Sequence, residues 1–317
     1  MRGGIAAQHP PGQGSKKGEP GHTTPMWWDI AQAISTATGQ KFRVGSRQPV
    51  GGGCINEAVC LQGDGQSYFV KLNSAKRIDM FEAEAAGLSV MAASESVRVP
   101  QPITWGISGD RSWLVLEHID FNPAAAEASA TLGAQLAQMH RFQAEQFGWE
   151  RDNTIGSTPQ HNAWSGDWLS FFAEHRLGYQ LRLAGDNGAA ASLLDKGERL
   201  RHNLDAFFDG YKPSASLLHG DLWAGNWGVD GAGSPVLFDP AVYYGDREAD
   251  LAMTELFGGF DENFYRAYRE AWPMDVGYRV RKGLYNLYHI LNHFNLFGGG
   301  YGHQAEDMLD ALLAQAN

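Results

Sequence analysis

The apolar pattern of this chain changes character near Pro123, and this change constrains the fold more than any other feature. Before Pro123, short segments rich in β-branched and aromatic residues are separated by Gly, Pro and Asp, which is typical of strands. Gly63-Asp64-Gly65 predicts a hairpin between two of them. Helical spacing is found instead at Met26–Thr38 and Asp79–Ala92. The predicted strands are Phe42–Val50, Asn56–Leu61, Tyr68–Leu72, Ile103–Ile107 and Trp113–Leu116.

After Pro123 the apolar spacing is that of long helices, except for short strands and turns within Leu217–Asp239. The helices are predicted at Ala124–Arg141, Trp168–Leu183, Ala189–Phe208, Asn263–Ala271, Tyr278–Phe297 and Gln304–Ala316. The sequence therefore predicts an α+β fold of two lobes, similar in layout to protein kinases. A small antiparallel β-rich N-lobe with one main helix, residues 26–118, would bind nucleotide. A larger helical C-lobe, residues 119–317, would carry the catalytic and acceptor groups.

Composition limits the classes of partner and compartment. The 317 residues include 36 acidic and 25 basic side chains, a net charge of −11, so a nucleic-acid partner is not expected. No apolar run is long enough to span a membrane. Only two cysteines occur, Cys54 and Cys60, which favours a cytoplasmic protein over a disulfide-built secreted one. Residues 1–25 are Gly/Pro-rich and predicted to be disordered; they lack the apolar core of a secretory signal, and organelle targeting through them stays open.

The strongest motif is His219-Gly220-Asp221-Leu222-Trp223-Ala224-Gly225-Asn226, followed thirteen residues after its Asn by Asp239. Phosphoryl transfer needs a carboxylate that orients the attacking hydroxyl and accepts its proton. It also needs oxygen ligands that hold Mg²⁺ against the phosphates. An H-x-D-x-x-x-x-N loop with a later strand-end Asp supplies both. We predict Asp221 as the base and Asn226 and Asp239 as metal ligands. A capped turn before a hairpin has similar residues, but the combined spacing favours catalysis.

A lysine in an apolar strand matches this motif. Phe69-Val70-Lys71-Leu72 places a cation where an unpaired charge would be costly. Glu84 on the following helix is the predicted partner, in the Lys–Glu pair that positions the α- and β-phosphates of ATP in kinases. Glu82 is the rival on that helix, but it lies two residues round the turn and should point elsewhere. A surface lysine at the strand end is the alternative interpretation.

Two further segments are predicted to bind ATP. Gly51-Gly52-Gly53-Cys54 lies between the first two predicted strands, where a phosphate-covering loop belongs. It lacks G-x-G-x-x-G, and a Gly-rich hairpin has the same composition, so its position upstream of Lys71 carries the prediction. Glu117-His118-Ile119 ends the fifth strand at the lobe junction, where backbone groups can bind the adenine edge.

Taken together, these motifs resemble the fructosamine kinase (ketosamine-3-kinase) family, relatives of the aminoglycoside and choline kinases. HGDxxxxN alone indicates only a kinase-like protein, whereas the long stretch that begins at Phe238 is far more selective. The resemblance runs from about Trp27 to the end of the chain. The matching stretches are GGGCIN, FVKLN, FEAEAAGL, VRVP, DNTIGSTPQHN, HGDLWAGNW, FDPAVYYGDREADLAMTELFGGF and LYHILNHFNLFGGGY.

The resemblance implies a kinase that uses ATP and Mg²⁺ to phosphorylate the sugar O3 of a ketoamine, a fructosamine or ribulosamine, free or protein-bound. The phosphorylated adduct would then break down and release the amine, which amounts to deglycation. By the same resemblance, Asp221 is the proton acceptor and Glu117 to Ile119 the ATP hinge.

Two other functions stay open. A kinase for another small hydroxyl acceptor, such as an aminoglycoside or choline, is the first. An aminoglycoside is polycationic and requires an acidic cleft, whereas a sugar stacks on aromatic rings, so the Trp-containing loop favours the sugar. The second is a non-catalytic nucleotide-binding or scaffold protein, against which the intact set of Lys71, Asp221, Asn226 and Asp239 argues.

Several residues are candidates for the acceptor side. We predict that Trp223 covers the acceptor sugar with its indole face and that Trp227 packs in the core. His289 is predicted to line the acceptor pocket, and a buried hydrogen-bonded role fits equally well. His293 lies four residues on, but the pair lacks the Glu of a zinc motif and a third ligand. Asp250 is expected to brace the catalytic loop by hydrogen bonds.

Cys54 is a candidate redox residue. It follows three glycines in a loop that must admit ATP, and Lys71 nearby would favour its thiolate. A mixed or intermolecular disulfide would tether the loop, lower activity reversibly and link two copies in a dimer. Cys60 is predicted to lie too far across the sheet for an unstrained internal bridge. The alternative is a small loop residue without a redox role.

Overall fold

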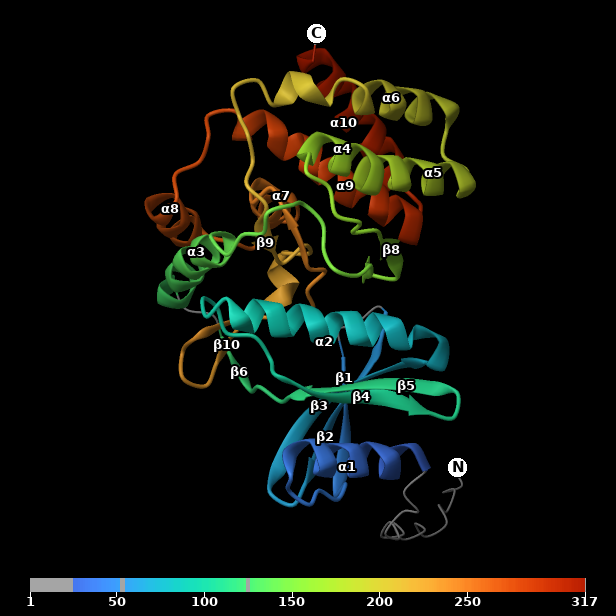
Figure 1. Cartoon of the computed structure of the whole chain (residues 1–317), viewed down its shortest axis with the longest axis vertical. Helices are drawn as coiled ribbons and strands as arrows, with labels where there is room; N and C mark the ends of the chain where they lie inside the picture. Colours follow the sequence, from blue (N-terminus) through green and yellow to red (C-terminus); the bar gives the residue numbers. More distant parts are fainter. Residues whose placement is uncertain (1–24, 52–54, 124–125, 317) are drawn as a thin grey trace, which may run out of the picture.

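The computed structural model describes residues 25–51, 55–123 and 126–316. Two lobes follow one another along the long axis, and the C-terminal end lies on the far side of the helical lobe (Figure 1). The N-lobe sheet is antiparallel, with the order β1-β2-β3-β5-β4. All five predicted strands are present. They are β1 (Ser46–Val50), β2 (Glu57–Gly63), β3 (Gln66–Ser74), β4 (Pro102–Ser108) and β5 (Arg111–Glu117).

The predicted hairpin joins β2 and β3 through a two-residue turn. Asp64 and Gly65 have φ of 48° and 78°, the left-handed conformation that a type I′ turn requires at both positions. The Asp64 carboxylate accepts a hydrogen bond from Arg43 N at 2.8 Å. This turn fixes the register of β3, so that Lys71 faces the opposite side of the sheet from its neighbour Leu72.

Two helices cover the two faces of the sheet (Figure 1). Helix α1 (Pro25–Thr38) packs on the face that presents Val115, and α2 (Ile78–Ala93) packs on the face of Leu114 and Leu116. A short 3₁₀ turn, η1 (Ala75–Arg77), leads into α2. Helix α2 is the main helix of the N-lobe and lies between the sheet and the C-lobe. Its buried side chains belong to the same hydrophobic core as those of the C-lobe.

The C-lobe is built mainly of helices. Helix α3 packs against α8, and α9 runs through the middle of the lobe against α5, α7 and α10. The elements are α3 (Ala126–His140), α4 (Trp168–Phe171), the π-helix η2 (Phe172–Gly178), α5 (Tyr179–Asp186), α6 (Ala191–Arg201), η3 (Leu204–Phe207), α7 (Glu248–Leu256), α8 (Glu262–Ala271), α9 (Tyr278–Phe297) and α10 (Tyr301–Gln315). No helix in these described ranges is both long and apolar enough to cross a membrane.

Short strands position the functional loops. They form three small sheets, β6-β10-β11, β9-β12 and β7-β8. Since β6 pairs with β10, the chain has entered the C-lobe by Phe121, and we propose the lobe boundary between Glu117 and Phe121. The elements are β6 (Phe121–Asn122), β7 (Asn153–Ile155), β8 (Thr158–Gln160), β9 (Ser216–Leu218), the 3₁₀ turn η4 (Ala224–Asn226), β10 (Trp227–Asp230), β11 (Pro235–Leu237) and β12 (Tyr243–Gly245).

Three predicted elements differ from the structure by more than three residues or in helix type. The first strand begins at Ser46 and not at Phe42, because the ladder with β2 starts there and Phe42 N instead bonds Ser35 Oγ at 2.9 Å. The continuous helix predicted over Ala189–Phe208 is wrong, since α6 ends at Arg201 and a separate 3₁₀ turn follows. The helix predicted at Trp168–Leu183 is helical throughout but contains the π-helical segment η2.

Helix α7 was not predicted at all. From Glu248 to Thr254 every residue is buried, so the segment has no polar face and no helical alternation to detect. Its buried acidic residues, Glu248 and Asp250, read as loop residues in the sequence. They are buried because each has partners inside the protein.

Candidate functional site

A buried lysine lies between two carboxylates at the junction of the lobes. Lys71 Nζ on β3 donates to Glu84 Oε1 on α2 at 2.6 Å and to Asp239 Oδ1 at 2.5 Å. Burial alone would lower the pKa of Lys71, but the two carboxylates outweigh burial and raise it, so the ammonium stays charged. The predicted contact with Glu84 is present, whereas Glu82 faces Arg151 at 3.4 Å.

His219 fixes the geometry of residues 219–226, here called the HGD loop. Its Nδ1 accepts a hydrogen bond from Asp221 N at 3.2 Å, and its Nε2 lies 2.9 Å from Phe238 O. Since Nδ1 accepts, the proton is on Nε2 and is donated to Phe238. Burial lowers the pKa of His219, which keeps the ring neutral. The imidazole therefore links two segments. One is the HGD loop, which carries Asp221, and the other is Phe238, the residue before Asp239.

Asp250 on α7 braces the backbone of the HGD loop. Its Oδ2 accepts from His219 N at 2.7 Å, and its Oδ1 accepts from Gly220 N at 2.9 Å. His140 Nε2 lies 3.0 Å from Oδ2, and His140 Nδ1 lies 2.8 Å from the Tyr268 hydroxyl. The bracing contacts predicted for Asp250 are thus confirmed.

Close backbone approach brings the HGD loop against the segment after Asp239. Gly220 has φ of +82°, and a Cβ at this position would lie 2.0 Å from Ala241 O. Ala241 N donates to His219 O at 2.8 Å, so the two segments are held in register. Asp239 itself has φ of 55°, which is uncommon outside glycine and is found where surrounding structure holds a functional side chain in place.

Asp221 is the carboxylate predicted to accept the proton. Burial, together with the nearby Asp239 carboxylate, raises the pKa of Asp221 to about 7, against the opposing hydrogen bond from Asn226. A group with a pKa close to the working pH is effective in general acid–base catalysis. Asn226 Nδ2 donates to Asp221 O at 2.8 Å and lies 3.4 Å from Asp221 Oδ2, which sets the orientation of the side chain.

The donor set of the site fits a hard divalent cation. Asn226 uses its amide nitrogen within the loop, so its amide oxygen remains as a ligand atom. Asp239 is 48% exposed at its side chain and bonds Lys71 through one oxygen only. Carboxylate and amide oxygens are the ligands that Mg²⁺ prefers. The carboxylates of Glu84 and Asp239 contact the one ammonium group of Lys71, and the Asp221 carboxyl lies near that of Asp239.

The predicted nucleotide-binding segments are partly described. Gly51 follows β1 and is exposed, while Gly52, Gly53 and Cys54 lie outside the described residues. At the lobe junction the Glu117 carboxylate accepts from Arg98 Nη2 at 2.5 Å and from Gln101 N at 3.2 Å. In the described part of the chain, His118 and Ile119 make no backbone hydrogen bond, which leaves their N–H and C=O groups for a planar ligand edge.

The two tryptophans of the motif differ in their surroundings. Trp223 is 42% exposed, and its indole lies against Gly225, where a Cβ would be 2.1 Å from the ring. Trp227 is half-buried and stacks on Phe260 with ring centroids 6.0 Å apart. The expected packing of Trp227 in the core is confirmed.

His289 lies on the buried face of α9. Its ring is next to that of Tyr288, and burial lowers the pKa of His289 to about 3. Among the described residues its Nδ1 is one of a few buried polar atoms without a hydrogen-bond partner. Nothing in these contacts places it against Asp221, so acceptor binding by His289 stays a prediction.

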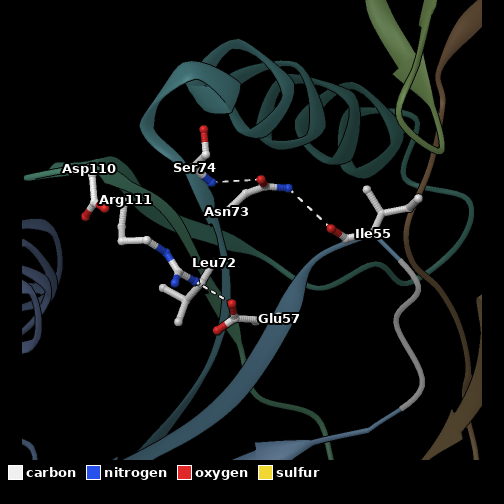
Figure 2. Close-up of a pocket in the computed structure, with 7 residues that line it drawn as sticks. All are labelled: Ile55, Glu57, Leu72, Asn73, Ser74, Asp110 and Arg111. Carbon is white, nitrogen blue, oxygen red and sulfur yellow. Dashed lines mark hydrogen bonds and ion pairs between the residues drawn. The ribbon is translucent and has the colours of Figure 1, made fainter.

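The hollow shown in Figure 2 is separate from this site. It has a volume of about 230 Å³ and lies at the end of the N-lobe sheet. Leu72 lines it, whereas Lys71 does not. The lining residues are Ile55, Glu57, Leu72, Asn73, Ser74, Asp110 and Arg111.

Two buried charges near the site were not predicted. Arg176 on the π-helix is fully buried, donates to Asn162 Oδ1 at 2.7 Å and lies 4.0 Å from the ring centroid of Tyr243. Arg281 on α9 pairs with Glu248 at 2.7 Å. A signal existed for Glu248, since it lies in the selective stretch that begins at Phe238. For the arginines, a cation in an otherwise amphipathic helix is indistinguishable in the sequence from a surface residue.

Comparison with known proteins gives a consistent match over the described lobes. A family model described as "Fructosamine kinase" matches residues 26–315. A protein of Synechocystis named "Probable ketoamine kinase" is 51% identical over 292 residues, 90% of this chain and 97% of that protein. A chloroplastic protein-ribulosamine 3-kinase of Arabidopsis thaliana is 44% identical over 289 residues, 90% of this chain and 86% of that one. A crystal structure from Haemophilus somnus, described as a fructosamine-3-kinase, superposes with a TM-score of 0.84 at 29% identity and covers 90% of this chain and 98% of that one.

Proposed function

Because this chain belongs to the fructosamine kinase family, we propose that it transfers the γ-phosphoryl group of ATP to the sugar 3-hydroxyl of a ketoamine, a fructosamine or a ribulosamine. The observation that carries the proposal is the pair of contacts that buried Lys71 makes with Glu84 and Asp239, beside Asp221. The product would break down and release the amine, so the reaction would deglycate amines.

In this mechanism each residue acts at a stated atom. Lys71 Nζ, held by Glu84, would bind the α- and β-phosphates, and the backbone of His118 and Ile119 would bind the adenine edge. One Asp221 carboxylate oxygen would accept the proton of the acceptor 3-hydroxyl. The hydroxyl oxygen would attack the γ-phosphorus while the bond to the β–γ bridging oxygen breaks and ADP leaves. The raised pKa of Asp221 suits this step, because the group can take up a proton near neutral pH.

Asn226 and Asp239 would hold Mg²⁺ through their side-chain oxygens. When bound, the ion would neutralise charge on the phosphates. Residues 51–54 would cover the phosphates, and of these only Gly51 is described.

The acceptor would lie on the C-lobe side of the cleft. Trp223 exposes its indole two residues after Asp221, where it can cover a sugar ring. We also assign His289 to the acceptor site, because its Nδ1 has no hydrogen-bond partner among the described residues. An exposed indole favours a sugar over the polycationic acceptor of an aminoglycoside kinase, which is the alternative function. Few cysteines favour a reducing compartment such as the cytoplasm.

We expect Asp221→Asn to keep nucleotide binding and to lose kcat by a factor on the order of 10² or more, because general-base catalysis contributes about that. The measurement is ADP release with a fructosyl- or ribulosyl-amine, together with calorimetry of a non-hydrolysable ATP analogue. Asp205→Asn, an exposed Asp of the same lobe, is the matched control. Normal turnover by the Asp221 variant would refute the assignment of the base.

Asp239→Ala should shift the Mg²⁺ dependence of turnover to higher concentration, because one oxygen ligand of the cation is lost. The same change removes one partner of Lys71, so Glu84→Gln, which removes the other partner but no ligand, is the control. A Mg²⁺ titration of both variants separates the two effects. If both titrations match that of the wild type, Asp239 is not a metal ligand.

Trp223→Ala should raise KM for the ketoamine much more than KM for ATP. Loss of an aromatic platform costs on the order of 1–3 kcal/mol, by analogy with bases stacked on aromatic side chains. Trp28→Ala is the matched control, since Trp28 is 59% exposed on α1, on the far side of the sheet. An equal loss for both substrates, or a lower melting temperature alone, would indicate a packing role.

Cys54→Ser should make the enzyme resistant to mild oxidation. In the wild type, diamide would oxidise two Cys54 thiolates of neighbouring copies to a disulfide, lower activity and produce a dimer that dithiothreitol reverses. Cys60→Ser is the control, because Cys60 is buried and burial raises the pKa of its thiol. Activity and non-reducing electrophoresis measure both effects. Equal inhibition of wild type and Cys54→Ser would remove Cys54 from the redox role.

A further inference from the structure

The β7–β8 hairpin, residues 153–160, comes from a distinctive stretch of sequence that the proposed reaction does not use. Its strand β7 packs against α2, and its side chains bond the C-lobe carbonyls of Ala241 and Val242. Its strands are only three residues long, so its shape depends on the side chains that anchor it. Those side chains contact the two segments that carry the Lys71 partners, helix α2 with Glu84 and the segment after Asp239.

On the C-lobe side the hairpin holds the segment that follows Asp239. Asn153 Nδ2 donates to Val242 O at 2.8 Å, and Gln160 Nε2 donates to Ala241 O at 3.0 Å. Gln160 Nε2 also donates to Asn153 Oδ1 at 2.9 Å. Two consecutive carbonyls, two and three residues after Asp239, are thus fixed by one pair of amide side chains.

This pair is itself anchored in the buried core. Tyr288 OH on α9 donates to Gln160 Oε1 at 2.8 Å. Asn162 Nδ2 donates to Asn153 Oδ1 at 2.9 Å, and Asn162 Oδ1 accepts from Arg176 Nη2 at 2.7 Å. A buried amide network in which each of these polar atoms has a partner holds one geometry, because every alternative leaves an atom unpaired.

On the N-lobe side the same hairpin meets α2 and the turn before it. Arg151, two residues before β7, pairs with Glu82 at 3.4 Å, and Arg77 Nη1 donates to Ser157 O at 3.3 Å. Glu82 lies two residues before Glu84 on α2. At the tip, a Cβ on Gly156 would lie 3.0 Å from Leu296 of α9 and 3.9 Å from Ile55.

We propose that the β7–β8 hairpin is a positioning element that sets the spacing of Glu84 and Asp239 around Lys71. The hairpin contacts both α2 and the segment after Asp239. It is therefore a second connection between these two segments, in addition to the contacts that Lys71 makes with Glu84 and Asp239. Loss of its anchor would let α2 move relative to Asp239, and Lys71 would no longer be held at the phosphates. The inference rests on the proposed function for its effect on turnover, but not for its effect on nucleotide binding.

Asn153→Asp tests the anchor, since it keeps the shape and the acceptor oxygen but replaces the donor to Val242 O with a carboxylate oxygen. We expect kcat to fall about tenfold and the Kd of a non-hydrolysable ATP analogue with Mg²⁺ to rise about fivefold. KM for the ketoamine should change less than twofold. Asn187→Asp is the matched control, because Asn187 makes the same kind of contact to Asn295 between α5 and α9.

The decisive measurement is a double-mutant cycle with Glu84→Gln. If the hairpin acts through the ion pair, Asn153→Asp should cost less than twofold in Kd once Glu84→Gln has already broken that pair. Additive losses, or a wild-type Kd for Asn153→Asp, would overturn the proposal. The Kd cycle needs no acceptor, so it decides the proposal even where the wild type fails to phosphorylate a ketoamine, a result that would count against the proposed function alone.

A second variant covers the case in which Asn153→Asp does not fold. Arg151→Gln breaks only a half-exposed ion pair and should leave the fold intact. We expect it to raise the Kd of the ATP analogue twofold to threefold, again non-additively with Glu84→Gln. Arg111→Gln is its control, since it breaks the Arg111–Glu57 pair on the hollow in Figure 2. Equal effects of Arg151→Gln and Arg111→Gln would contradict positioning by the hairpin.

Discussion

The site depends on the contacts of the Lys71 ammonium group with two carboxylates. Transfer of an unpaired ammonium group from water into a protein costs several kcal/mol, so its burial requires carboxylates at contact distance. Glu84 and Asp239 supply them from α2 and from the segment after β11. The sheet, the main helix of the N-lobe and the C-lobe are therefore held together at one atom.

Hydrogen bonds in the C-lobe place the HGD loop against this ion pair. Asp250 binds two consecutive backbone amides of the loop, and His219 joins the loop to Phe238. Gly220 makes the approach to Ala241 possible. The loop is rigid because each of these buried polar groups has a partner, and an unpaired group would cost about 1–3 kcal/mol.

Sequence reasoning predicted the parts that have a regular period or a chemical signature. The alternating strands, the Asp64-Gly65 turn and the partner of Lys71 followed from residue type and spacing. Helix α7 did not, because a segment buried on all sides has no polar face to detect. Arg176 and Arg281 were missed for a related reason, since only the folded chain brings Asn162 and Glu248 to them. Long-range partners of buried charges leave no local pattern.

The two aspartates at the HGD loop show how one local structure separates a structural role from a chemical one. Burial would raise the pKa of Asp250, but the hydrogen bonds from His140 and from the loop backbone outweigh it and lower the pKa. Burial and the nearby Asp239 carboxylate raise the pKa of Asp221 to about 7, because its one donor, Asn226, is too weak to oppose them. A carboxylate whose oxygens are fully used cannot take a proton from a substrate, whereas one with a free oxygen and a raised pKa can. The loop thus satisfies the Asp250 carboxylate and leaves Asp221 with one weak donor, a contrast that supports the proposal of Asp221 as proton acceptor.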